Sequence, residues 1–124
     1  MLIIDANAIL RYVLYDNENM ANEVNDLILN KKITVRYEVM AEVVYVLEKV
    51  YAMSRNEIAG GIKVFLGLPN IETETVGVLQ LALETYASVK MDFVDCLLYG
   101  FYSVCGHDIF TFDKKLKSVI ERAV

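Results

Sequence analysis

Apolar and polar residues follow one another along the chain in a pattern that predicts short buried strands separated by amphipathic helices. Runs rich in β-branched or aromatic residues predict strands at 2–5, Ile33–Val35, Asn70–Thr75 and Asp108–Phe112. Elsewhere apolar residues recur every three or four positions, which is the period of an amphipathic helix. These stretches predict helices at Asn7–Leu14, Met20–Leu29, Glu38–Tyr51, Arg55–Leu66, Val76–Val89 and Phe93–Cys105, with a last helix that starts at Asp113.

The order of these elements predicts the fold class. Strands and helices alternate, and the stretches between strands are long enough for the crossover connections that parallel strands require. Helices that join parallel strands cover both faces of the sheet. We therefore expect an α/β fold, a three-layer α/β/α sandwich with a short, mainly parallel central sheet, formed by a single domain over residues 1–124.

Local signals mark the ends of several predicted helices. Ser54 and Glu57 form a capping-box pattern before Arg55–Leu66. Asp92 is the expected N-cap of the helix Phe93–Cys105. Asn7 either caps the first helix or orients the neighbouring Asp5, and the cap is favoured because Asn is a preferred N-cap residue.

Composition excludes several classes of protein. Hydrophobic residues make up 56% of the 124 residues, with one proline and six glycines, which excludes a disordered chain. The apolar runs are shorter than the roughly 20 residues of a spanning helix, and no signal-peptide pattern opens the chain, so we expect a cytoplasmic protein. We expect Cys96 and Cys105 to be reduced, buried thiols. The net charge of −5 argues against a broad basic face that wraps duplex nucleic acid.

Four acidic residues lie in apolar surroundings: Asp5 and Asp113 at strand ends, Glu42 beside a helical core stripe that includes Val43 and Val46, and Asp95 inside an apolar helix. Each has a structural explanation of its own. Asp5 and Asp113 are suitable helix caps, Asp95 suits the positive end of a helix dipole, and Glu42 suits a solvated helix edge. In a parallel sheet, however, the strands end at one edge, so the four carboxylates are expected to converge there.

Four converging carboxylates would repel one another without a cation. Hard oxygen ligands of this kind suit Mg²⁺ or Mn²⁺, and such ions support phosphodiester hydrolysis without a side-chain nucleophile. The one histidine, His107, lies in a predicted surface turn and offers no Ser-His or Cys-His pair. The pattern therefore indicates metal-dependent hydrolysis.

The motifs LIIDAN, AEVVYVL, DFVDCLL and IFTFDKKL, in this order, resemble the PIN domain, and most of all the VapC-type ribonuclease toxins of bacterial and archaeal toxin–antitoxin pairs. The resemblance covers essentially the whole chain. It implies that Asp5, Glu42, Asp95 and Asp113 bind the metal, and that Thr111 supports the site by hydrogen bonding. It also implies a homodimer and a small antitoxin partner that covers the active-site groove.

The expected function is Mg²⁺- or Mn²⁺-dependent cleavage of single-stranded RNA. The alternative is a PIN-like module that binds RNA or a protein partner without cutting. Asp92 lies one helical turn before Asp95 and either caps the helix or touches the metal site. Arg11 is the main candidate for holding an RNA phosphate, and Lys114 and Lys115 are either phosphate ligands or part of a solvated face.

Overall fold

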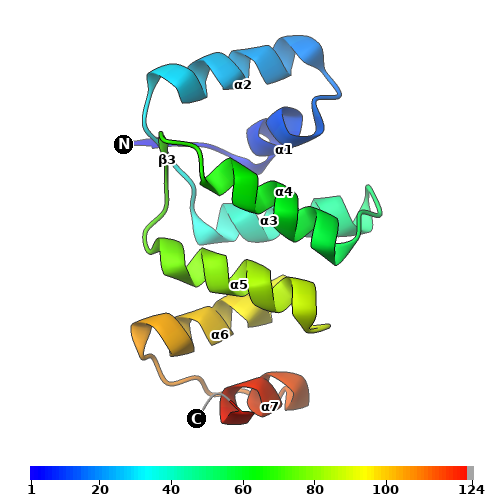
Figure 1. The fold of residues 1–124 in the computed structure, drawn as a ribbon, viewed down its shortest axis with the longest axis vertical. Coiled ribbons are helices and arrows are strands. Elements are labelled where there is room, and N and C mark those ends of the chain that lie inside the picture. Colours follow the sequence, from blue (N-terminus) through cyan, green and yellow to red (C-terminus); the bar gives the residue numbers. More distant parts are fainter. Residues whose placement is uncertain (123–124) are drawn as a thin grey trace. The chain divides into compact units, whose positions relative to one another are not determined.

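The computed structural model describes residues 1–122 and contains two compact units (Figure 1). The first unit is Met1–Glu74, and the second begins at Thr75. Of the described elements, three strands and four helices lie in the first unit and three helices in the second. Compact units need not fold independently, so the single domain expected over residues 1–124 stays a prediction.

A short parallel sheet lies in the first unit. Its strands are β1 (Leu2–Ile3), β2 (Ile33–Thr34) and β3 (Ile71–Glu72), in the order β1-β2-β3. Leu2 is in register with Ile33, and Ile33 with Ile71, both in the parallel sense. The first three predicted strands are therefore present but shorter than the sequence pattern suggests.

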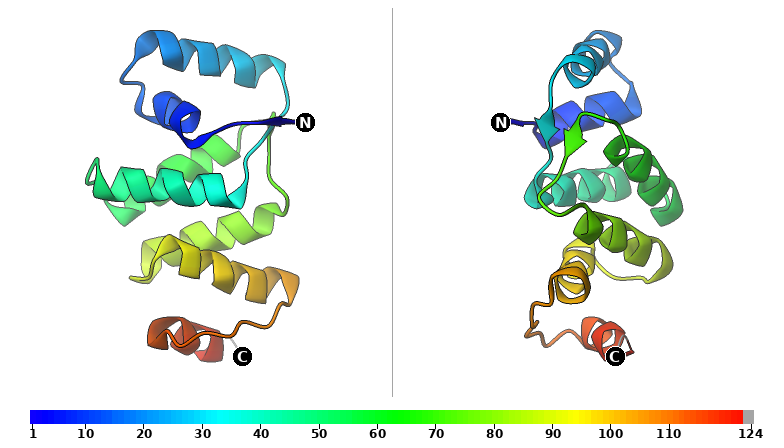
Figure 2. Two further views of the ribbon diagram at one scale, coloured as in Figure 1. Left: turned by 180° about the vertical axis from the view of Figure 1, so that it is seen from behind. Right: turned by 60° about the vertical axis from the view of Figure 1, so that its left-hand side comes forward.

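The four helices of this unit are α1 (Ala6–Leu14), α2 (Glu18–Asn30), α3 (Tyr37–Lys49) and α4 (Arg55–Leu66). The strands lie between α2 on one side and α3 on the other in all three views (Figures 1 and 2). The predicted α/β class, with a parallel sheet between helical layers, is confirmed.

The ends of these helices follow from local hydrogen bonding. The Asn17 side chain accepts a bond from the Met20 N–H at 3.1 Å, so α2 begins earlier than the apolar pattern indicates. The capping box predicted before α4 is confirmed. Ser54 Oγ accepts from the Glu57 N–H at 3.1 Å, and the Glu57 carboxylate accepts from the Ser54 N–H at 3.2 Å.

Apolar side chains from the four helices, β2 and β3 form the core of this unit. Ile9, Ile33, Met40, Leu47, Ile58 and Ile62 are fully buried. Rings of Tyr12 on α1 and Phe65 on α4 lie 5.7 Å apart between centroids. The buried residues of α3 are Met40, Val43, Val44 and Leu47, so the stripe is rotated slightly from the one that the sequence predicts.

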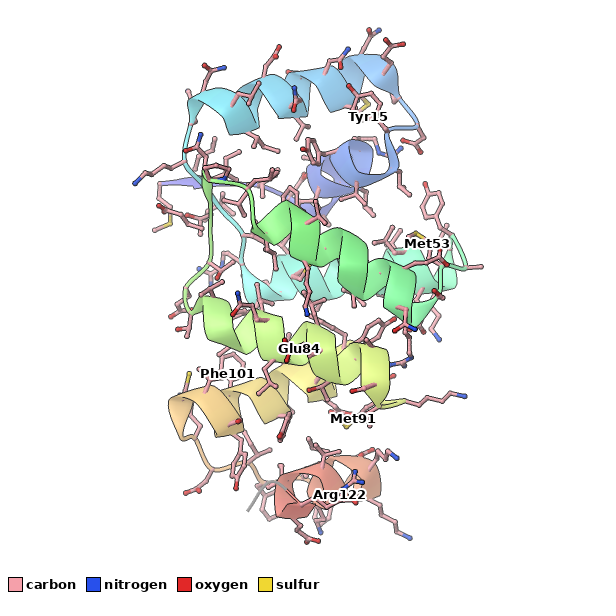
Figure 3. The ribbon with its side chains drawn as sticks, in the orientation of Figure 1. Tyr15, Met53, Glu84, Met91, Phe101 and Arg122 are labelled. Atoms are coloured by element: carbon pink, nitrogen blue, oxygen red, sulfur yellow. The ribbon has the colours of Figure 1, made fainter. Side chains whose placement is uncertain are left out.

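The second unit consists of α5 (Val76–Ser88), α6 (Phe93–Cys105) and α7 (Lys114–Arg122). The helices α5 and α6 approach closely because Gly100 has no side chain. A Cβ atom at Gly100 would meet the Val78 carbonyl oxygen at 2.9 Å. The T-shaped pair of Tyr86 and Phe93, with centroids 5.8 Å apart, packs the same two helices together. Figure 3 shows Met91 where the chain turns from α5 to α6.

The strand predicted at Asp108–Phe112 is wrong. This segment has no regular secondary structure, although Gly106 ends α6 as expected with φ of 75°. A strand requires a partner that accepts its backbone hydrogen bonds, and the described strands are β1, β2 and β3. Its aromatic residues are correspondingly open to solvent, with Phe110 86% and Phe112 84% exposed.

The expectation of two buried thiols is half right. Cys96 is buried in α6, but Cys105 is exposed because it lies in the last turn of that helix, and neither forms a disulfide within residues 1–122. In residues 1–122 no helix combines the length and apolar character needed to cross a bilayer.

Candidate functional site

Asp5 lies between β1 and α1 and caps the helix. Its Oδ1 accepts a hydrogen bond from the Ala8 N–H at 2.9 Å, and its backbone is extended. The prediction that Asn7 is the cap is therefore wrong, because Asp5 holds that position and Asn7 lies inside the first turn of α1. Asp and Asn are equally good caps, so residue type alone does not distinguish them. Asp5 is exposed, and its capping bond fixes the direction of its side chain.

Glu42 lies in the second turn of α3 and is exposed. Met40, two positions before it, and Val43, directly after it, are fully buried, so core packing on both sides positions this part of α3. Among the described residues Glu42 makes no ion pair. The first unit therefore presents two solvent-accessible carboxylates, Asp5 and Glu42, from two different helices.

Asp95 lies in the first turn of α6 and is partly buried. Burial raises the pKa of its carboxyl above the ordinary value, and the negative charges of Asp113 and Asp92 raise it further. No lysine or arginine of the described residues forms an ion pair with it. In the second unit Asp95 therefore lies within electrostatic reach of Asp113 and of Asp92.

Asp113 caps α7, and Thr111 orients it. The Asp113 Oδ1 accepts a hydrogen bond from the Leu116 N–H at 2.8 Å, and the Asp113 N–H donates to Thr111 Oγ1 at 3.0 Å. The predicted position of Asp113 at a strand end is wrong, because no strand precedes it, but its place at the start of the last helix is as expected. Asp92 precedes α6 at the N-cap position as expected, although its side chain makes no capping bond.

The predicted acids are therefore divided between the two units. Asp5 and Glu42 belong to the first, and Asp95 and Asp113, with Asp92, to the second. Over residues 1–122, neither unit contains a group of three or more acidic, histidine or cysteine side chains that would hold a metal ion by itself. The donors that each unit offers are carboxylate oxygens, which suit Mg²⁺ or Mn²⁺. A cation beside Asp95 would also offset the repulsion that raises the pKa of this residue.

Arg11 has protein partners. Its Nη1 donates to Asp16 Oδ2 at 3.0 Å, and its Nη2 donates to the Tyr51 hydroxyl at 3.4 Å. The hydrogen bond to Tyr51 raises the pKa of Arg11. Burial opposes this effect, and the negative charge of Asp16 adds to it. These contacts connect α1 with the segments that follow α1 and α3. Lys114 and Lys115 are exposed in the first turn of α7, immediately after Asp113.

A groove of about 620 Å³ lies between α1 and α2, and Asp5 is part of its wall. Asn7 and Arg11 line it from α1. From α2 it is lined by residues that include Met20, Glu23, Val24, Asp26 and Leu27. The sequence pattern did not single out these α2 residues, although their spacing of three and four positions places most of them on one helical face.

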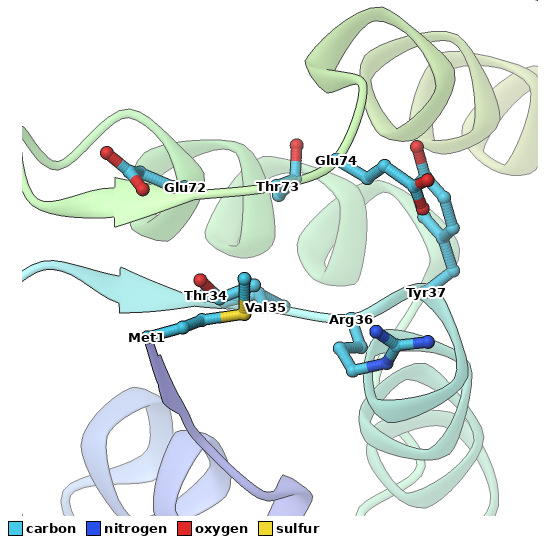
Figure 4. Close-up of a pocket in the computed structure, with 8 residues that line it drawn as sticks. All are labelled: Met1, Thr34, Val35, Arg36, Tyr37, Glu72, Thr73 and Glu74. Carbon is cyan, nitrogen blue, oxygen red and sulfur yellow. The ribbon is translucent and has the colours of Figure 1, made fainter.

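A second cavity, of about 390 Å³, lies beyond the ends of β2 and β3 (Figure 4). Arg36 and Tyr37 from the start of α3, and Glu74 from the segment after β3, are among its lining residues. Arg36 forms an ion pair with Glu38, and this hydrogen bond lowers the pKa of the Glu38 carboxyl. None of the four predicted metal-binding acids is among the residues that line this cavity.

Comparison with known proteins identifies one family. A sequence model of the PIN domain matches residues 2–121, nearly the whole chain. No curated protein and no solved structure matches the chain significantly.

Proposed function

Because the chain belongs to the PIN domain family, whose members are generally metal-dependent nucleases, we propose that it is a Mg²⁺- or Mn²⁺-dependent endoribonuclease. Asp5, Glu42, Asp95 and Asp113 together would hold the metal. The observation that carries the proposal is the set of carboxylates without cationic partners. Among the described residues, no ion pair involves any of these four acids, and in the second unit Asp95 and Asp113 are close enough to raise the pKa of Asp95.

The protein's own groups would position the metal and the substrate. The capping bonds of Asp5 and Asp113 fix the directions of these two carboxylates, and Thr111 fixes the backbone of Asp113. Burial and the charges of Asp113 and Asp92 raise the pKa of Asp95, and a cation bound there would offset this effect. The bound ion supplies activation of water and stabilisation of charge on the phosphate oxygens. No side-chain nucleophile is required.

The proposed biological role is that of the toxin in a toxin–antitoxin pair. The order of the four acidic motifs over the whole chain supports this role. The proposed partners are an RNA substrate, a small antitoxin protein and a second copy of the chain as a homodimer. The proposed location is the cytoplasm.

Cleavage of single-stranded RNA by purified protein tests the proposal. We expect cleavage with Mg²⁺ or Mn²⁺ that EDTA abolishes. Asp5→Asn and Asp95→Asn are expected to lower the rate at least about 100-fold, the scale of losing one group that stabilises charge at a reacting centre. Asn retains the helix-capping ability of Asp5, so the loss would not reflect unfolding.

Asp108→Asn is the matched control, because Asp108 is exposed in the same connection as Asp113 and is not among the proposed ligands. It should cleave at the rate of the unchanged protein. Equal cleavage by all the variants would contradict the proposal and point to a contaminating nuclease. Absence of both cleavage and divalent-ion binding would favour a PIN module that binds RNA or a protein without cutting.

A further inference from the structure

The groove between α1 and α2 has the size and lining of a binding site for a small organic group. Its volume of about 620 Å³ lies within the range of pockets that hold such groups. Asp5, a proposed metal ligand, forms part of its wall, so a group bound there would lie directly beside the proposed reacting phosphate. The groove belongs entirely to the first unit.

The α2 wall combines an apolar surface with acidic residues. Val24 is 9% exposed and Leu27 is partly buried, whereas Met20 is 40% exposed and offers a flexible apolar surface. Glu23 and Asp26 are exposed beside them, and neither makes an ion pair among the described residues. The groove thus offers apolar contact together with unpaired hydrogen-bond acceptors.

The charges of the groove select a neutral group. Three lining carboxylates, Asp5, Glu23 and Asp26, face two cations, Arg11 and Lys31, and Arg11 is already bonded to Asp16. Once Asp5 holds the proposed metal, Glu23 and Asp26 balance Arg11 and Lys31, and because Arg11 already pairs with Asp16 the wall offers a phosphate no net attraction. The neutral part of a nucleotide is its base. Proteins that read single-stranded RNA bind unstacked bases through hydrogen bonds to the base edges.

On the basis of the proposed function, we propose that this groove receives one unstacked guanine of the RNA substrate, next to the bond that is cut. A carboxylate accepts two parallel hydrogen bonds from adjacent N–H donors. Guanine is the base that presents such a pair on its Watson–Crick edge, at N1 and the exocyclic N2. Glu23 or Asp26 accepts these bonds, Met20 and Leu27 contact the base faces, and Asp5 holds the metal beside the neighbouring phosphate.

Sequencing the ends produced from a randomised pool of single-stranded RNA tests this proposal. We expect guanine to be enriched at one position adjacent to the cut. The double variant Glu23→Gln and Asp26→Asn should reduce that enrichment about tenfold or more, which is the discrimination typical of one bidentate base contact. Glu18→Gln removes an acid of the same helix that does not line the groove, and it should retain the enrichment.

Inosine in place of the preferred guanosine gives a sharper comparison, because inosine lacks the N2 amino group. The unchanged protein should cleave the inosine RNA several-fold more slowly, and the double variant should cleave both RNAs equally. Metal-dependent cleavage without guanine enrichment, or enrichment that survives the double variant, would overturn the base assignment and leave the nuclease proposal intact.

Photocross-linking provides a measurement that does not need cleavage. RNA that carries 6-thioguanosine is irradiated with the Asp95→Asn variant, and the cross-linked peptide is identified by mass spectrometry. Cross-links within residues 18–31 would support the groove even if no RNA is cut. Cross-links confined to other segments, or none, would overturn the proposal and leave the groove available to a protein partner.

Discussion

Replacing Gly100 by alanine should destabilise the protein, although alanine is the better helix former. Gly100 lies in the middle of α6, where alanine gains up to about 1 kcal/mol of helix propensity. The new Cβ would lie 2.9 Å from the Val78 carbonyl oxygen and 3.1 Å from its Cγ1. The backbone oxygen cannot rotate away, so α5 and α6 must separate.

The expected magnitude follows from these opposing effects. Overpacking of a well-packed interior costs about 1–3 kcal/mol, and a contact of 2.9 Å with a backbone oxygen belongs to the upper part of that range. After the gain of about 1 kcal/mol in helix propensity, we expect the free energy of unfolding of Gly100→Ala to fall by about 1–2 kcal/mol. For a chain of this length that corresponds to a fall in Tm of roughly 4–8 °C. Urea and thermal unfolding, followed by circular dichroism, would measure it.

Gly60→Ala is the matched control. Gly60 also lies inside a helix, α4, but a Cβ there would meet nothing within 4 Å. The same substitution should therefore raise the free energy of unfolding by about 0.5–1 kcal/mol. If both variants were stabilised equally, the close approach of α5 and α6 at Gly100 would be refuted.

Two further substitutions test local hydrogen bonds. Ser54→Ala removes half of the capping box of α4 and should lower the free energy of unfolding by about 1 kcal/mol, whereas Ser103→Ala, at an exposed helical position, should not. Equal stability of these two variants would contradict the capping role. Thr111→Val removes the acceptor for the Asp113 N–H and should lower RNA cleavage about 10- to 100-fold, as loss of a group that supports a metal ligand does. Thr111→Ser should retain activity, and a fully active Thr111→Val would contradict the supporting role.

Features set by neighbouring residues could be predicted from the sequence. The capping box at Ser54 and Glu57, the end of α6 at Gly106 and the extent of α6 depend on contacts within a few positions, and all three are confirmed. The choice between Asp5 and Asn7 as the first cap failed because both residue types suit the position. Which residue caps α1 depends on where β1 ends, and the apolar pattern does not define that end to a single residue.

Features that depend on distant partners could not be predicted. The segment Asp108–Phe112 has the composition of a strand, but a strand forms only where another strand pairs with it. The groove between α1 and α2 was missed for a similar reason. Glu23 and Asp26 look like ordinary solvated acids in the sequence, and only the packing of α2 beside α1 brings them to one wall with Asp5.

Arg11 illustrates the limit of residue-by-residue reasoning about the site. A basic residue one turn after a predicted metal ligand suggests a phosphate contact. In the folded chain its hydrogen bonds to Asp16 and Tyr51 connect α1 with two loops of the first unit, and the phosphate contact stays a prediction. Those partners lie 5 and 40 positions away in the sequence, so only the folded chain reveals the second of them.

Calorimetric titration of the protein with Mn²⁺ tests most directly the proposal that Asp5, Glu42, Asp95 and Asp113 bind the metal. The unchanged protein and Asp108→Asn should bind Mn²⁺ alike, whereas Asp5→Asn and Asp95→Asn should each weaken binding strongly, because each removes one of the proposed ligands. Binding that survives either Asp5→Asn or Asp95→Asn unchanged would contradict this proposal.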